Sequence, residues 1–295
     1  AVMRNAKYIN TEAVTAFTAL HIKKLDGYTY KDLAYTGQGI RALLSKSSHK
    51  FDMQNGKQII TKGMYLSPSD EMSRVLKIKP INTCPNATKT CRAGCLIFTG
   101  RMKFKTSISC RVKKTALFYK FPIEFLDQLI DEIFSEDRIA FREGNQLQIR
   151  LNGTSDIPWE NFINMSLLIK DMRALNMFYD YTKSPTRNTD PNYKLTFSVS
   201  GKTTMDQMLT ALQSGSIAIV VDPKSHKALT KLESPYIING DLSDHRPQDP
   251  IGSIVILKLK GKRSENTPFV KNTEFVVNTI IQLKKQAHTI TEKIA

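Results

Sequence analysis

Short apolar segments alternate with helical patterns through the second half of the chain. The apolar segments cover residues 147–151, 177–182, 195–200, 216–221, 236–238 and 253–257. Strands that alternate with helices form parallel βαβ units, and continuous apolar strands are typical of sheets covered on both faces. Residues 177–182 and 195–200 have no helical pattern between them. We therefore predict an α/β partial barrel of six to seven mostly parallel strands rather than a regular eight-fold barrel.

Two regions are expected in this chain of 295 residues. Residues 1–73 are weakly patterned and are predicted to form a small, mainly helical N-terminal segment. Residues 74–295 are predicted to form the cysteine-containing partial barrel with a C-terminal extension, beginning with a strand at 75–81. Helices are predicted at residues 11–17, 30–44, 107–120, 122–137, 155–175 and 204–212.

All four cysteines lie between residues 84 and 110. Cys84, Cys91 and Cys95 follow the predicted strand at 75–81, and Cys110 lies in a predicted helix. No secretory signal is visible and no apolar run is long enough to span a bilayer, so a cytoplasmic protein without a membrane contact is expected. Thiols stay reduced in the cytoplasm. Ligand binding is therefore favoured over disulfide formation.

The cysteine spacing favours an iron–sulfur cluster. Thiolates bind zinc and iron–sulfur clusters, and structural zinc sites usually have two close cysteine pairs. The spacing here is C-x6-C-x3-C-x14-C, without a close pair. A 4Fe–4S cluster is predicted, with zinc as the alternative. If Cys110 is a ligand, the site is closed by four thiolates; if not, one iron stays open for substrate or cofactor chemistry.

Polar residues follow the predicted strands at their carboxyl ends. Active sites of parallel α/β barrels lie at this end of the strands. We therefore expect the cysteine loop to meet these residues at one mouth of the barrel. The residues are Asn152, Ser155, Asp156, Lys183, Ser198 and Ser200.

The formal net charge is +16, and part of the excess is concentrated beside the cysteines. Such an excess attracts polyanions. Residues 101–120 contain seven basic residues and no acidic residue. Phe104, Phe118 and Tyr119 lie within this stretch and offer rings for base stacking, although aromatic residues at helical spacing are more often core residues. A nucleic-acid-binding surface is predicted, for DNA or RNA. Its basic residues are Arg101, Lys103, Lys105, Arg111, Lys113 and Lys114.

Three aspartates near a histidine indicate another possible site. Asp241, Asp244 and Asp249 lie close to His245 in the sequence. Carboxylates in this number bind the divalent ions that nucleases use, although aspartates beside proline and glycine are also ordinary turn residues. A metal-dependent nuclease is therefore an alternative function.

Four segments of the chain together carry a family resemblance. They are 83–101 with its three cysteines, 149–156, 178–184 and 195–200. In this order they resemble the phage gene product 88 family over about residues 74 to 260. The resemblance implies a viral protein that works in the host cytoplasm, and it implies no particular reaction.

The order of parts also resembles radical S-adenosylmethionine enzymes, which place a three-cysteine loop after the first strand of a partial barrel. The spacing here is x6 and x3 rather than x3 and x2. Residues 152–156 also stand where those enzymes have a Gly-Gly-Glu-type segment. Both differences argue against S-adenosylmethionine as a cofactor.

The sequence thus predicts an iron–sulfur protein that binds nucleic acid through a basic surface beside the cluster. The alternatives are a radical-type or other redox enzyme with an open cluster iron, a metal-dependent nuclease, and a structural zinc protein. The sequence contains no complete catalytic constellation, so it decides neither the enzyme question nor the oligomeric state.

Overall fold

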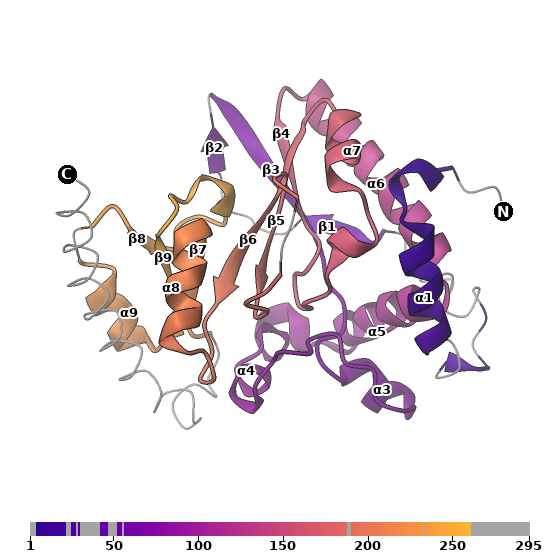
Figure 1. Cartoon of the computed structure of the whole chain (residues 1–295), viewed down its shortest axis with the longest axis horizontal. Helices are drawn as coiled ribbons and strands as arrows, with labels where there is room; N and C mark the ends of the chain where they lie inside the picture. Colours follow the sequence, from indigo (N-terminus) through magenta and orange to yellow (C-terminus); the bar gives the residue numbers. More distant parts are fainter. Residues whose placement is uncertain are drawn as a thin grey trace.

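A computed structural model describes residues 4–21, 25–27, 29, 42–46, 52–54, 56–187, 190–232 and 234–260 (Figure 1). Most of the helix predicted at 30–44 and the C-terminal extension after residue 260 lie outside these residues. Within them, no helix is both long enough and apolar enough to cross a bilayer.

Nine strands form one sheet in the described part of the chain. Their bounds are β1 (Leu44–Lys46), β2 (Asp52–Gln54), β3 (Lys57–Met64), β4 (Gln146–Arg150), β5 (Leu175–Thr182), β6 (Tyr193–Ser198), β7 (Ser216–Val221), β8 (Ile237–Asn239) and β9 (Ile254–Lys258). The order is β1-β3-β4-β5-β6-β7-β9-β8, with β2 also paired to β3. All neighbours from β3 to β8 are parallel, whereas β1 and β2 are antiparallel to β3.

The predicted mixed α/β fold with a mostly parallel sheet is confirmed. The strand path ends at β1 on one side and β8 on the other, so the described strands do not close into a barrel. The sheet also extends across the division predicted at residue 73, because β3 pairs with β4 in parallel.

The helices surround the sheet on its sides and at one end. In Figure 1, α1, α6 and α7 lie on one side and α8 and α9 on the other, while α4 lies below the carboxyl ends of β5 and β6 and α3 lies below α5. The helices are α1 (Thr11–His21), α3 (Glu71–Leu76), α4 (Lys89–Ala93), α5 (Lys105–Lys120), α6 (Pro122–Arg142), α7 (Met165–Lys170), α8 (Met205–Ser214) and α9 (Pro223–Leu229), with 3-10 turns η1 (Ala6–Tyr8), η3 (Leu96–Phe98), η4 (Gly100–Lys103), η5 (Trp159–Asn161) and η6 (Arg246–Gln248).

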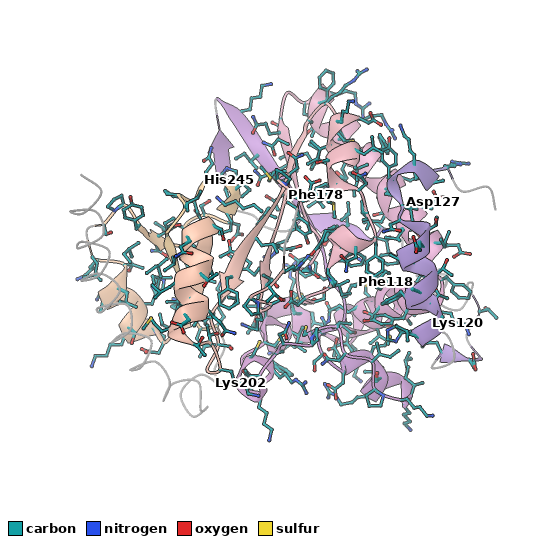
Figure 2. The ribbon with its side chains drawn as sticks, in the orientation of Figure 1. Phe118, Lys120, Asp127, Phe178, Lys202 and His245 are labelled. Atoms are coloured by element: carbon teal, nitrogen blue, oxygen red, sulfur yellow. The ribbon has the colours of Figure 1, made fainter. Side chains whose placement is uncertain are left out.

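The apolar cores lie on one face of the sheet. Tyr193 on β6 packs with the core of α1, α5 and α6, and Phe197 on the same strand packs with the core of α8 and α9. Alternate strand residues face the same side, so both cores share one face. Phe118, labelled beside α1 in Figure 2, is fully buried in the larger core, 4.8 Å from the ring of Trp159.

The opposite face carries buried polar groups and is crossed by residues 243–249. Gln148 and Thr196 are fully buried there, together with Tyr179 and Val255. His245 Nδ1 lies 2.9 Å from Gln148 Oε1, and Lys194 Nζ donates to the carbonyls of Pro247 and Asp249. The sheet therefore has an apolar face covered by helices and a mixed face, with buried polar residues, that is crossed by a loop.

The prediction of a strand at residues 75–81 is wrong. Helix α3 ends there, Lys77 takes the left-handed conformation with φ 55°, and Val75 is 51% exposed. The apolar residues of this segment reflect contacts with the core instead, because Leu76 and Ile78 pack partly buried against it and Ile81 is buried in it. The strand that precedes the cysteine loop is β3, which lies within the segment predicted to be mainly helical.

The helix predicted from Ser155 begins only at Met165. The side chain of Asn164 caps it by accepting from the amide of Leu167 at 2.9 Å. The residues before it form a loop, because the Asn152 side chain accepts from Ser155 Oγ and the amide of Ile157. These side-chain bonds give the backbone an alternative to the hydrogen bonds of a helix.

Candidate functional site

A cavity of about 200 Å³ lies where β3, β4, β5 and β6 end. Cys84, Cys91 and Cys95 line it from the segment that contains α4. Five of the six predicted strand-end residues line it from the opposite side, namely Asn152, Ser155, Asp156, Lys183 and Ser198. Ser200 is not among its lining residues and lies 3.3 Å from Thr203, hydroxyl to hydroxyl. The cavity therefore brings thiols and strand-end polar groups together.

Thr83 fixes the start of the cysteine loop. Its amide donates to the carbonyl of Ser69 at 3.1 Å, and its hydroxyl donates to the carbonyl of Ser67 at 2.5 Å. Its own carbonyl accepts from the amide of Asp156 at 2.9 Å. These bonds join the loop to the segments that follow β3 and β4, which places Cys84 at the sheet edge.

Burial favours the protonated form of two cavity thiols. Burial raises the pKa of Cys84 to about 11 and also raises the pKa of Cys95. Cys84 Sγ lies 3.7 Å from the carbonyl oxygen of Thr154. A metal must displace these protons when it binds, because the thiolate is the ligand.

Cys110 is separate from the other three cysteines. It is exposed on α5 and does not line the cavity, whereas Cys84, Cys91 and Cys95 are partly buried. In the described part of the chain, no three His, Cys, Asp or Glu side chains are arranged to hold one metal ion.

Asn152, which lines the cavity, is held by the buried carboxylate of Asp180. Asp180 is fully buried and accepts from the amide of Asn152 at 2.9 Å and from the hydroxyl of Tyr193 at 2.6 Å. Arg150 Nε lies 3.7 Å from Asp180 Oδ1. Burial nevertheless dominates and raises the pKa of Asp180 to about 6, against the lowering effect of Arg150 and Tyr193.

This pKa predicts a pH dependence of stability. A carboxyl group whose folded pKa is raised stabilises the fold fully below its unfolded pKa, and that stability is lost as the pH rises through the folded value. From about pH 4 to about pH 6, we expect the wild-type free energy of unfolding to fall on the order of 1 kcal/mol per pH unit relative to Asp180→Asn. Urea denaturation of both proteins across this window measures the difference, and parallel curves would contradict it.

Asp156 is held by groups around the mouth of the cavity. Its Oδ1 accepts from Thr182 Oγ1 at 2.8 Å, and its Oδ2 accepts from the amide of Lys183 at 2.9 Å. Arg187 lies 3.4 Å from the same carboxylate and is also paired with Glu160. Asp156 therefore orders the segment after β5.

Gly153 allows the segments after β3 and β4 to approach closely. A Cβ atom here would lie 2.6 Å from the ring of Tyr65 and 2.7 Å from the carbonyl oxygen of Met64. We expect Gly153→Ala to lower the free energy of unfolding by about 1–3 kcal/mol, through overpacking. Gly215→Ala is the control, because its nearest contact would be an ordinary 3.5 Å. Equal stability of the two variants in urea denaturation would contradict the close approach.

The predicted basic surface is only partly exposed. Arg111 and Lys114 are buried, and Lys114 Nζ donates to the carbonyl of Leu43 at 2.7 Å. Both are therefore closed to a polyanion in this structure. Lys113 is half-buried, whereas Arg101, Lys103 and Lys105 are exposed.

The aromatic residues in this stretch divide in the same way. Phe104 is 53% exposed, whereas Phe118 and Tyr119 are core residues. The latter two are therefore not base-stacking residues.

The three aspartates do not form a metal site in the described structure. Asp241 lies 3.2 Å from His226 and accepts from the amide of Lys258. Asp249 is paired with Arg246 at 3.3 Å. The carboxylate of Asp241 therefore joins α9 to β9, and that of Asp249 is paired within the segment that crosses the sheet. Asp244 lies in the same segment, where its carbonyl accepts from the amide of Arg246 at 3.1 Å.

Sequence reasoning missed Arg150, which lines the cavity beside Tyr181. Its position inside an apolar strand pattern hid it, since Arg150 is the last residue of β4. Its place at a strand end next to Asn152 is the signal that identifies it.

Comparison with known proteins gives one match. The gene product 88 family model matches residues 42–273, while no curated protein and no solved structure matches the chain. The match includes the cysteine segment and all strands that surround the cavity, and it confirms the resemblance seen in the sequence. The chain belongs to the gene product 88 family.

Proposed function

We propose that this chain is an iron–sulfur protein whose cluster is held by Cys84, Cys91 and Cys95 and is open to a small molecule in the cavity. The supporting observation is that these three cysteines share a cavity with strand-end polar residues, while Cys110 is exposed elsewhere. A fourth thiolate would close the site. Because Cys110 lies outside the cavity, an open iron is favoured, and with it a redox or related enzyme rather than a purely structural centre.

The donor set fits a cluster better than a single ion. Three thiols on one cavity provide soft ligands. They do not converge on a single ion position in the described structure. In a cluster each thiolate bonds a different iron, so convergence on one point is not required. Zinc is therefore the weaker alternative.

The chain's own groups position such a centre. A bound 4Fe–4S cluster supplies one-electron chemistry. Thr83 fixes the loop, Asp156 orders the segment after β5, and Lys183 Nζ donates to Ser198 Oγ at 2.9 Å beside the cavity.

We also infer that the sheet is an opened partial barrel, with helices on its apolar face and a loop across the other face.

The open iron is tested by electron paramagnetic resonance of the reduced, anaerobically prepared protein. Imidazole is expected to change the spectrum, because it binds an iron that lacks a thiolate. S-adenosylmethionine is expected to leave the spectrum unchanged, in keeping with the different cysteine spacing. A spectrum that does not respond to imidazole indicates a closed cluster and contradicts the proposal.

A second candidate function is nucleic-acid binding at the rim of the cavity. Phe98 lines the cavity and is 43% exposed, and Phe104 is more exposed still. Arg101, Lys103 and Lys105 are exposed between and beside these rings. Exposed rings interleaved with cations are typical of surfaces that bind single-stranded nucleic acid.

The rim is tested with the combined variant Arg101→Gln, Lys103→Gln and Lys105→Gln. Fluorescence anisotropy of a labelled single-stranded oligonucleotide measures binding across a salt series. We expect the slope of log K against log salt to fall by about 2 units, since three phosphate contacts are lost. Lys170→Gln, exposed on α7, is the control. An unchanged slope in the triple variant would exclude this surface.

A further inference from the structure

The charged groups that line the cavity are predominantly positive. They are Arg74, Arg92, Arg150 and Lys183 against Asp70 and Asp156. Both carboxylates have cationic partners, because Asp70 lies 3.4 Å from Arg74 and Asp156 lies 3.4 Å from Arg187. The remaining charge in the cavity therefore belongs to cations.

Two of these cations retain capacity to bind a ligand. Arg150 Nε is buried without a hydrogen-bond partner in the described structure, and its nearest carboxylate oxygen, on Asp180, is 3.7 Å away. The guanidinium carbon lies 5.0 Å from the ring centroid of Tyr181, within the range of a cation–π contact. Lys183 Nζ donates to the carbonyl and hydroxyl of Ser198, and no carboxylate of a described residue pairs with it. An ammonium group has three donors, so one remains.

We propose that the cavity binds a small oxyanion, the phosphate or carboxylate group of its ligand, between Arg150 and Lys183. A planar guanidinium matches two oxygens of such a group, and an ammonium adds a further charge-assisted bond. The low exposure of the Arg150 side chain strengthens its interaction, because water competes less there. The oxyanion would belong to the ligand of the same cavity that is proposed to face the cluster. That this ligand is a substrate rests on the proposed function.

The test measures thermal stabilisation of the full-length, iron-free chain by sodium phosphate and, separately, sodium succinate. Sodium chloride at equal ionic strength is the reference. At least one oxyanion is expected to raise Tm saturably above the chloride reference. The more effective anion distinguishes a phosphate ligand from a carboxylate ligand.

Lys183→Met removes the ammonium and keeps the alkyl chain. We expect it to weaken oxyanion binding about tenfold or more. Lys202→Met is the matched control, since Lys202 is exposed near the lower end of α8 in Figure 2 and does not line the cavity. Equal affinity in Lys183→Met and wild type, or no oxyanion effect beyond chloride in wild type, would overturn the proposal.

The same titrations after iron and sulfide reconstitution separate the two proposals. Lys183-dependent oxyanion binding in a chain that retains no iron would leave this site standing and refute the cluster. A chain that retains the cluster but binds neither anion would refute only the oxyanion site.

Discussion

Arg111→Ala is expected to lower the free energy of unfolding by about 3–5 kcal/mol, because it leaves a buried carboxylate without its partner. Arg111 Nη2 lies 2.7 Å from Glu71 Oε1, and Arg111 Nε lies 3.1 Å from Glu71 Oε2. The Arg111 side chain is 3% exposed and that of Glu71 is 9% exposed. Arg111 Nη1 also donates to the carbonyl of Met102 at 2.8 Å. The variant therefore removes the side-chain bonds that join α5 to α3 and to η4, the segments on either side of the cysteine loop.

Urea denaturation of Arg111→Ala and Lys105→Ala measures this effect against an exposed cation of the same helix. Lys105→Ala is expected to change stability by less than about 0.5 kcal/mol. Similar values for the two variants would show that the pair of Arg111 and Glu71 is not buried. The comparison also bears on nucleic-acid binding, because binding lost in an Arg111 variant would follow from misfolding rather than from a lost phosphate contact.

Substitution of any one cavity cysteine is expected to remove most of the bound cluster. Cys84→Ala, Cys91→Ala and Cys95→Ala each delete one of the three proposed thiolate ligands, and no further cysteine lines the cavity to replace it. The loss is measured as iron retained per chain after anaerobic reconstitution and gel filtration. Circular dichroism of each iron-free variant checks that the fold is kept.

Cys110→Ala is the matched control, since this cysteine is exposed on α5. Iron retention equal to wild type is expected. A loss of iron as large as that of Cys84→Ala would mean that Cys110 is a fourth ligand and that α5 moves toward the cavity. Full retention in Cys84→Ala would contradict the assignment of the cavity cysteines.

Sequence patterns predicted the strands whose signal is local. β4 to β7 and β9 are apolar segments, and their approximate bounds follow from that pattern alone. β3 was missed because its alternation of buried and half-buried residues is meaningful only once it pairs with β4. The alternating segment at 75–81 failed for the converse reason, since Val75 points to solvent and Lys77 ends a helix. Which strand a segment pairs with depends on the tertiary fold, and this pairing outweighs the local preference of the sequence for strand or helix.

The candidate site divides in a similar way. Chain order was enough to place Asp156 and Lys183 near one another, because parallel strands end at the same edge of a sheet. Cys84 was expected there from a strand at 75–81 that the structure does not contain. It reaches the same edge through the hydrogen bonds of Thr83. The burial of Arg111 and Lys114 was not predictable from a basic run, since it depends on Glu71 and the Leu43 carbonyl in distant segments. Charged side chains are buried only where such partners exist.

The most direct measurement is the iron and acid-labile sulfide content of the wild-type chain prepared without oxygen, together with the same analysis of Cys110→Ala. We expect about four iron and about four sulfide per chain in both proteins, as for a 4Fe–4S cluster held by Cys84, Cys91 and Cys95. Zinc in place of iron and sulfide, or a metal-free wild-type chain after reconstitution, would contradict the account.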